Sequence, residues 1–295
     1  MNGQRRLLQA LLGTLVGGPA RQPLARPDAT LTVMLGDTPV QLLRQICVAG
    51  APLLPAAAGA ASGPRLRLIN LHENEATSVQ AASAALAARS GELIALHGQG
   101  RRLVRFYIGW RPHAFDPNRI FTDAGLDRTL SRHGSSTPAA RAAVRGLRDA
   151  VLGLLAPSES PEHVPEAAPV QPAARPEAPV VALHNTRASS YSIASYQPGA
   201  ALAGDAQRWV CPQPNHSNDF FLVTDGDWFD ALAAHGFNVV LQAMQATDDG
   251  SLSVWFAQQG RPYINVEAGF DRLDAQTRML EAVLDLAPAL RRSPR

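Results

Sequence analysis

Residues 65–97 read RLRLINLHENEATSVQAASAALAARSGELIALH, and this stretch decides the fold class. Arg65–Leu71 alternates polar and apolar side chains as a short strand does, whereas Ala76–Arg89 is rich in alanine and leucine and predicts a helix. A Ser-Gly turn then leads into a second strand, Leu93–His97. The stretch therefore predicts a strand–helix–strand unit, the building block of α/β folds.

The same alternation of strands and helices continues along the chain. Further strands are expected at Leu31–Leu35, Val180–Leu183, Phe220–Val223, Gly236–Leu241 and Tyr263–Val266. Helices are expected at Val40–Cys47, Thr137–Leu155, Asp227–His235, Ser253–Gln258 and Arg272–Leu290. We therefore expect a single α/β domain with a mixed, mostly parallel central sheet flanked by helices.

Two segments interrupt this pattern. Ala56–Pro64 is an Ala/Gly-rich link, and residues 157–179 alternate Pro, Ala and Glu. The second segment is too poor in apolar side chains to order itself, so we expect a partly extended loop. Because the chain on both sides of this loop supplies strands, it is an insertion within one domain spanning residues 29–295.

Residues 1–28 allow two interpretations. Two arginines precede the apolar run Leu7–Val16, and small residues follow as far as Ala20, which is the layout of a signal peptide. The other interpretation is an N-terminal amphipathic helix, because Gln9 and Thr14 interrupt the run. The first predicts a periplasmic or secreted protein and the second a cytoplasmic one.

The composition limits the class of protein. Of 295 residues, 46% are hydrophobic and 18% charged, as expected for a globular protein with a substantial core. The formal net charge of +2 is too small to indicate nucleic-acid binding. No stretch approaches the ~18 apolar residues needed to span a bilayer. Cys47 and Cys211 could form a disulfide or remain thiols, but they do not make a cysteine-based zinc site, so any metal ligands must be histidines and carboxylates.

Three residues with suitable chemistry follow predicted strands. His72, His184 and Glu267 each come directly after an apolar strand. In an open α/β sheet, the carboxyl ends of parallel strands form the crevice in which ligands bind. The placement of these three side chains therefore indicates a site at this edge of the sheet.

The first loop adds a second candidate ligand. In His72-Glu-Asn-Glu75, an imidazole and a carboxylate lie three residues apart, so one loop can present both to one ion. With His184 they make a His₂Glu set, which holds catalytic zinc and leaves a fourth position open. A general base is still needed, and Glu267 is the candidate. His-x-x-Glu alone is common by chance, and a surface loop is the alternative.

Two further motifs carry a family resemblance. Residues 111–121 read RPHAFDPNRIF and residues 183–186 read LHNT. Both strings, and their order along the chain, resemble signatures of the aspartoacylase and succinylglutamate desuccinylase family, within the zinc carboxypeptidase superfamily. The matching positions of the first motif are Arg111, Asp116, Asn118, Arg119 and Phe121.

The resemblance implies a zinc carboxypeptidase-like fold and one Zn²⁺ per chain. His72, Glu75 and His184 would hold the ion, and Glu267 would act as general base and then as general acid. The family's Glu-x-Gly-like context is here Glu267-Ala-Gly, which is close to the pattern but not diagnostic.

The resemblance also implies roles on the substrate side. Asn118 and Arg119 would bind a substrate carboxylate, and Arg111 would polarise the scissile carbonyl. The alternative for Arg119 is a salt bridge to Asp116 or Asp123. No counterpart of the family's small C-terminal β-domain is predicted after the last strand, so substrate identity does not carry over.

These observations predict a zinc-dependent hydrolase of an amide or peptide bond next to a free carboxylate. Its substrate would be a small peptide or an N-acyl amino acid, with an ester substrate as a further alternative. A different class of function is also open, namely a non-catalytic relative that binds an anionic peptide or a partner protein. Tyr191 and Tyr196 follow His184 closely and could supply a substrate-contacting phenol, although a structural role is the alternative for each.

Overall fold

A computed structural model describes residues 27–47, 66–87, 89–156, 177–187 and 191–290 of the chain. The strands are β1 (Ala29–Leu35), β2 (Thr38–Cys47), β3 (Arg67–Asn70), β4 (Gly91–His97), β5 (Val104–Ile108), β6 (Arg111–Phe115), β7 (Val180–Thr186), β8 (Ala206–Val210), β9 (Phe220–Val223), β10 (Val239–Gln242) and β11 (Tyr263–Gly269). The α-helices are α2 (Ala76–Leu86), α3 (Asp123–His133), α4 (Pro138–Leu154), α5 (Gly226–Ala234), α6 (Leu252–Gln258) and α7 (Leu273–Leu290). Short 3₁₀ helices are η1 (Pro117–Arg119), η2 (Ile193–Tyr196), η3 (Ala203–Asp205) and η4 (Pro214–His216).

Three predictions fall outside the described residues. They are most of the signal peptide or N-terminal helix expected at residues 1–28, the link at Ala56–Pro64 and most of the insertion expected at residues 157–179; of the first and the last, residues 1–26 and 157–176 are not described. The domain boundaries and the compartment therefore stay predictions.

Nine of the described strands form one sheet, in the order β1-β2-β4-β3-β7-β11-β9-β10-β8, and β5 and β6 form a separate hairpin. The neighbours β4, β3, β7 and β11 pair in parallel, as do β9 and β10. The pairs β1–β2, β2–β4, β9–β11 and β8–β10 are antiparallel. The predicted mixed α/β sheet is confirmed, with its parallel strands at the centre.

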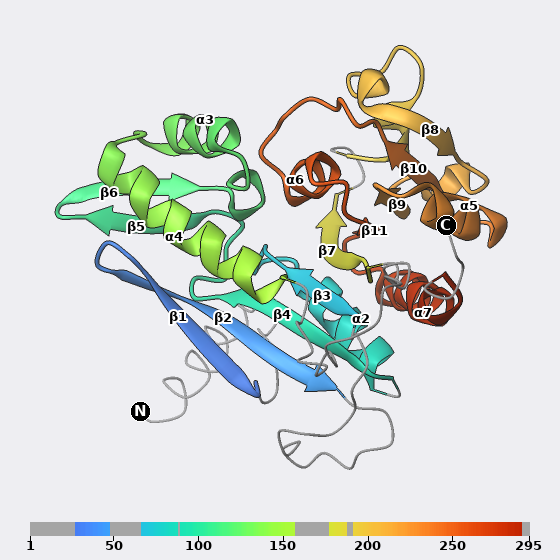
Figure 1. The fold of residues 1–295 in the computed structure, drawn as a ribbon, viewed down its shortest axis with the longest axis horizontal. Coiled ribbons are helices and arrows are strands. Elements are labelled where there is room, and N and C mark those ends of the chain that lie inside the picture. The colour runs from blue at the N-terminus through green and yellow to red at the C-terminus, as the bar shows by residue number, and fades with distance from the viewer. Residues whose placement is uncertain (1–26, 48–65, 88, 157–176, 188–190, 291–295) are drawn as a thin grey trace, which may run out of the picture.

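Helices cover both faces of the sheet (Figure 1). Val181 and Leu183 of β7 point into a core that they share with α2, α5 and α7. Val180 and Ala182 point to the opposite face, into a core shared with α3, α4 and α6. This alternation follows from the two-residue period of a strand, and it puts His184 on the same face as Ala182.

Most predicted elements are present, but Val40–Cys47 is strand β2 and not a helix. Its backbone pairs with β1 on one side and with β4 on the other. Gly36, with a φ of 58°, makes the turn that returns the chain from β1 to β2. The spacing of apolar residues in this segment is compatible with a helix or a strand. The segment forms a strand because its backbone hydrogen-bonds to a neighbouring strand on each side. The β5–β6 hairpin, α3 and β8 had no counterpart among the expected elements.

The structure shows the state of the two cysteines and the character of the described helices. Cys47 and Cys211 are both unpaired thiols. Within the described residues, the helices lack the length and apolar character that crossing a bilayer requires.

The topology decides where functional side chains can meet. Strands β3, β7 and β11 are consecutive neighbours in the sheet and run in the same direction. Their carboxyl ends therefore lie side by side at one edge, where a crevice for a ligand is expected.

Candidate metal centre

The loop between β3 and α2 carries His72 and Glu75. The two residues are joined by a backbone hydrogen bond from the Glu75 N–H to the His72 carbonyl, 2.9 Å long. Ser78 fixes the end of the loop, because its hydroxyl donates to the Glu75 carbonyl at 2.7 Å. Both His72 and Glu75 are 1% exposed. A buried imidazole and a buried carboxylate are therefore held on one turn of chain, which argues against a solvated surface loop.

The neighbouring strands bring His184 and Glu267 to the same place. His184 lies on β7 and Glu267 on β11, and the two residues are paired across the parallel ladder. Both are buried. The side chains predicted from the strand-end pattern thus meet at one edge of the sheet.

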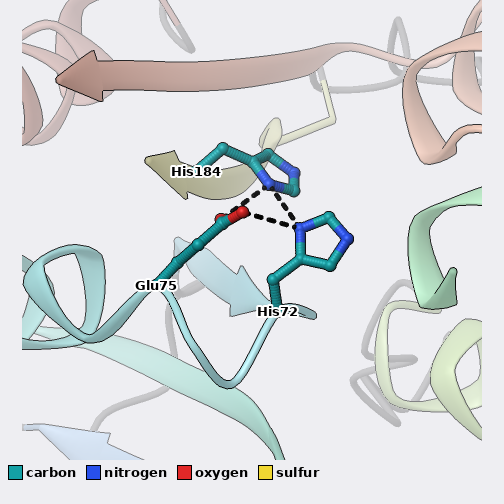
Figure 2. Close-up of side chains that lie close together, drawn as sticks. All are labelled: His72, Glu75 and His184. Atoms are coloured by element: carbon teal, nitrogen blue, oxygen red, sulfur yellow. Dashed lines mark hydrogen bonds and ion pairs between the residues drawn. The ribbon is translucent and has the colours of Figure 1, made fainter. Parts of the chain in front are cut away.

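The donor atoms of His72, Glu75 and His184 converge closely (Figure 2). Nδ1 of His72 is 3.2 Å from Nδ1 of His184 and 3.0 Å from Oε1 of Glu75. Nδ1 of His184 is 3.1 Å from Oε2 of Glu75. Ligand atoms ~2.0–2.1 Å from a tetrahedral zinc ion lie ~3.3 Å from one another, so these separations fit one ion. The donor set, two imidazoles and a carboxylate, is also one that zinc accepts.

A second layer of contacts orients these side chains. Nε2 of His72 lies 2.8 Å from Oδ1 of Asp116, which fixes the ring with Nδ1 facing Glu75 and His184. Arg102 donates to both carboxylates, at 3.0 Å to Glu75 and 3.0 Å to Asp116. A carboxylate that holds the outer nitrogen of a histidine is the usual support of a metal-binding imidazole.

The electrostatics of this cluster favour a cation among the donors. Burial alone would lower the pKa of His72, but the charge of Glu75 and the hydrogen bond to Asp116 outweigh burial and raise it to about 9. Burial alone would raise the pKa of Glu75, but the charge of His72 and the hydrogen bond from His184 lower it to about 2. The two buried carboxylates therefore favour positive charge beside them, from a protonated His72 as well as from Arg102.

The cluster opens into a cavity of about 760 Å³. Its lining includes His72, Glu75, His184 and Glu267. A volume of this size suits a small-molecule or peptide ligand. Burial raises the pKa of Glu267 above its ordinary value, and nearby His184 offsets part of that rise. A buried carboxylate with a raised pKa beside potential metal ligands has the properties of a proton-transfer group.

Arg119 and Asn118 also line the cavity, but both already have protein partners. Arg119 is 3.4 Å from Asp249, another residue of the cavity wall, and not paired with Asp116 or Asp123 in the described contacts. The Asn118 carboxamide accepts from the Leu252 N–H at 3.0 Å, and its nitrogen is 3.3 Å from Nε2 of His184. Each of these atoms has one further hydrogen-bonding position, since the NH2 group has two donors and the oxygen two lone pairs, so Asn118 can contact a substrate as well.

Arg111 lies away from the site, contrary to the role predicted for it. Its exposed guanidinium packs over Trp110 at the turn of the β5–β6 hairpin, and it is not part of the cavity lining. Asp116 directly follows the far end of β6, five residues and thus ~17 Å further along the chain than Arg111. The arginine that reaches the metal ligands is Arg102, because it precedes β5 and so lies beside the end of β6. The sequence resemblance did not indicate Arg102.

Two tyrosines close the cavity on another side. Tyr191 and Tyr196 form an edge-to-face pair with their ring centroids 6.0 Å apart, and their hydroxyl groups hydrogen-bond to each other. Burial raises the pKa of both phenols, so they are neutral hydrogen-bonding groups at the cavity wall.

The chain is similar to several solved structures. No family model matches the sequence, and no curated protein matches it either. An inferred metallopeptidase of Shewanella amazonensis SB2B has a TM-score of 0.41 and 13% identity, over 89% of this chain and 87% of its own. The murein-tripeptide amidase MpaA of Escherichia coli O157 has a TM-score of 0.39 and 14% identity, over 93% and 98%. An inferred metallopeptidase of Shewanella baltica OS155 has a TM-score of 0.39 and 12% identity, over 90% and 87%.

The resemblance of this chain to the zinc carboxypeptidase superfamily rests on its sequence motifs. The narrower resemblance to aspartoacylase and succinylglutamate desuccinylase stays a prediction.

Proposed function

We propose that the protein is a zinc-dependent hydrolase of an amide or peptide bond adjacent to a free carboxylate. One observation carries the proposal: His72, Glu75 and His184 direct three ligand atoms at a common point, all within 4.8 Å of one another, on the wall of a cavity that also holds Glu267. Three protein ligands of this kind are typical of a catalytic zinc site. A structural site would use a fourth protein ligand in place of an open position.

The chemistry divides between the ion and the side chains around it. A zinc ion held by these residues would supply an activated water and polarise the scissile carbonyl. Glu267 is the proton acceptor in this proposal, because its carboxylate is buried, lines the cavity and lies on the strand next to His184. After accepting the proton, the same carboxyl group would return it to the leaving amine.

The cavity also offers positive charge for a substrate carboxylate. Arg119 reaches the cavity with a side chain that is 36% exposed, and its present partner Asp249 is itself 44% exposed. Such an exposed ion pair contributes little, so a substrate carboxylate can compete for the guanidinium. A planar guanidinium can bind a carboxylate with two parallel hydrogen bonds, which would orient the bond next to that carboxylate.

The test combines metal analysis with hydrolysis. Purified protein is measured for bound metal and assayed with a panel of N-acetyl amino acids, dipeptides and the corresponding esters, with and without a chelator. We expect about one zinc ion per chain and chelator-sensitive release of the amine. His72→Ala should lose both the metal and the activity, whereas His133→Ala, a change at an exposed histidine of α3, should lose neither.

The other outcomes separate the alternatives. Cleavage of the esters alone would identify an esterase with the same site. Protein that binds anionic peptides equally well with and without chelator, and that cleaves no substrate, would instead be a non-catalytic binding protein. Loss of metal from His133→Ala, or retention of metal by His72→Ala, would contradict the assignment of the ligands.

A further inference from the structure

The cavity continues beyond Glu267 over three strands of the sheet. Leu222 of β9 pairs with Asn265 of β11 on one side and with Val240 of β10 on the other, so their side chains share a face. Gln242 is two residues after Val240 and Glu267 two residues after Asn265, so both point the same way. Leu222, Gln242 and Asn265 all line the cavity.

Two polar atoms in this part of the cavity have no hydrogen-bond partner among the described residues. They are Nε2 of Gln242, a donor, and Oδ1 of Asn265, an acceptor. Each of the two residues is 6% exposed. Buried polar groups in folded proteins are almost always paired, and leaving one unpaired is costly. An unpaired donor and an unpaired acceptor on one cavity wall therefore indicate a bound group that satisfies both.

The two side chains are positioned to act on one ligand group between them. Asn265 pairs with Leu222, and Leu222 pairs with Val240. Gln242 is two residues beyond Val240, so it lies two strand spacings across the sheet and ~7 Å along it, and the backbones of Gln242 and Asn265 are about 12 Å apart. The other arm of Asn265 is fixed, because its nitrogen donates to Oε1 of Glu267 at 3.2 Å. This bond fixes the carboxamide with its nitrogen toward Glu267, so the unpaired oxygen of Asn265 lies on the side of the group away from that nitrogen.

The unpaired atoms also limit the charge of the group that they bind. A carboxylate offers only acceptors and would oppose the Asn265 oxygen, whereas an ammonium group offers only donors and would leave Gln242 unpaired. The carboxylate of Asp205 lies near Gln242 in the chain fold, but its Oδ1 already accepts from the N–H and the hydroxyl of Thr247, at 2.8 and 2.9 Å. A neutral group with one acceptor and one donor fits both unpaired atoms.

We infer that Gln242 and Asn265 determine substrate specificity by binding a primary carboxamide in the substrate side chain. The preferred substrates would then release an amino acid of the glutamine type and not an aliphatic residue of the same length. This inference rests on the proposed function for the reaction that the substrate undergoes, but binding of the side chain does not depend on hydrolysis.

The test compares side chains of similar length. The metal-loaded protein is assayed with N-acetyl-L-glutamine, N-acetyl-L-methionine, N-acetyl-L-glutamate and N-acetyl-L-lysine. We expect kcat/KM for the glutamine substrate to exceed that for the methionine substrate about 10- to 100-fold, because methionine leaves both polar atoms unpaired. In Gln242→Met the ratio should fall at least about fivefold. The matched change Gln258→Met, at an exposed position of α6, should preserve the ratio.

A binding measurement separates this inference from the proposed function. Calorimetric titration with free L-glutamine and L-methionine requires no turnover, and glutamine should bind about 10-fold more tightly or better. If no substrate is cleaved but glutamine is still preferred, the proposed function fails and the specificity inference stands. Equal or tighter binding of methionine, the best turnover with glutamate or lysine, or an unchanged ratio in a folded Gln242→Met would overturn the inference.

Discussion

Replacing Asp116 by asparagine tests whether His72 is held for metal binding. The carboxylate accepts from Nε2 of His72 at 2.8 Å and from Arg102 at 3.0 Å, and its Oδ1 also caps η1 through the N–H of Asn118. Asparagine keeps the shape and an acceptor oxygen, so the cap and the ring orientation can persist. The substitution removes the negative charge behind the imidazole, and that charge makes His72 a stronger ligand. It also removes Oδ2, the acceptor for Arg102, and places an NH2 group there.

The expected effect on metal affinity follows from this geometry. Changes in the groups that support metal ligands lower affinity about 10- to 100-fold, which is about 1.4–2.7 kcal/mol. We expect Asp116→Asn to fall within that range because His72 is 1% exposed and water cannot replace the lost charge. Asp116→Ala should lie at the upper end, since it leaves the outer nitrogen of His72 without an acceptor.

The assay is competition for zinc between the protein and a chromophoric chelator at fixed pH. Asp127→Asn serves as the matched control, because this aspartate of α3 is 52% exposed and distant in its contacts from the cluster. Circular dichroism and thermal melting establish that each variant is folded. Zinc affinity in a folded Asp116→Asn equal to that of the wild-type protein would refute the assignment of His72 as a supported ligand.

Further predictions concern the role of Glu267 in catalysis, the choice between Arg102 and Arg111 as the arginine of the site, and stability. Glu267→Gln should keep its metal by elemental analysis and lose about 10²- to 10⁴-fold in kcat, the usual contribution of a general base; an unchanged kcat would exclude that role. Arg111→Ala should leave kcat/KM within about twofold, because surface changes of this kind are small, whereas Arg102→Ala should weaken zinc binding about 10-fold in the chelator assay. A large loss of activity in Arg111→Ala together with unchanged zinc binding in Arg102→Ala would instead favour Arg111, the arginine expected from the motif. Gly125→Ala should destabilise the protein by about 1–3 kcal/mol in urea unfolding, since the new Cβ would lie 2.2 Å from a backbone carbon of a neighbouring loop. Gly146→Ala in α4, with open space at that position, should instead stabilise the protein by ~0.5–1 kcal/mol. Removal of zinc by dialysis against a chelator should lower the melting temperature, and zinc at 100 times its Kd should restore about 2.7 kcal/mol.

The spacing of apolar residues along the chain was enough to predict most of the helices and strands. The helix at Thr137–Leu155 was predicted from one apolar face, and α4 occupies Pro138–Leu154 with Thr137 as its N-cap. Val40–Cys47 shows where periodicity fails, because a short run with apolar residues at several spacings can satisfy either a helix or a strand. Only its partners β1 and β4 decide between the two.

The candidate metal ligands could be predicted because each lies at a position that the chain itself defines. His72, His184 and Glu267 stand at the ends of predicted strands, and parallel neighbours bring their carboxyl ends to one edge. Glu75 follows from its three-residue spacing in the same loop as His72. Arg111 was assigned from the motif alone, and the motif does not show that the extended strand β6 holds Arg111 at the hairpin turn, a full strand length away from Asp116.

The sequence by itself determined the α/β class and the residue types that could bind a metal, since strand and helix periods and short loops are local properties of the chain. Tertiary structure alone decided which distant side chains share a contact, as Asp116 does with His72 and Arg102 does with both carboxylates. It also decided that Gln242 and Asn265 line the same cavity. The physical reason is that strand order and hairpin pairing are fixed by packing of the whole core. Residues 27 or 44 positions apart along the chain, such as Arg102 and Glu75 or Asp116 and His72, become neighbours only when those pairings form.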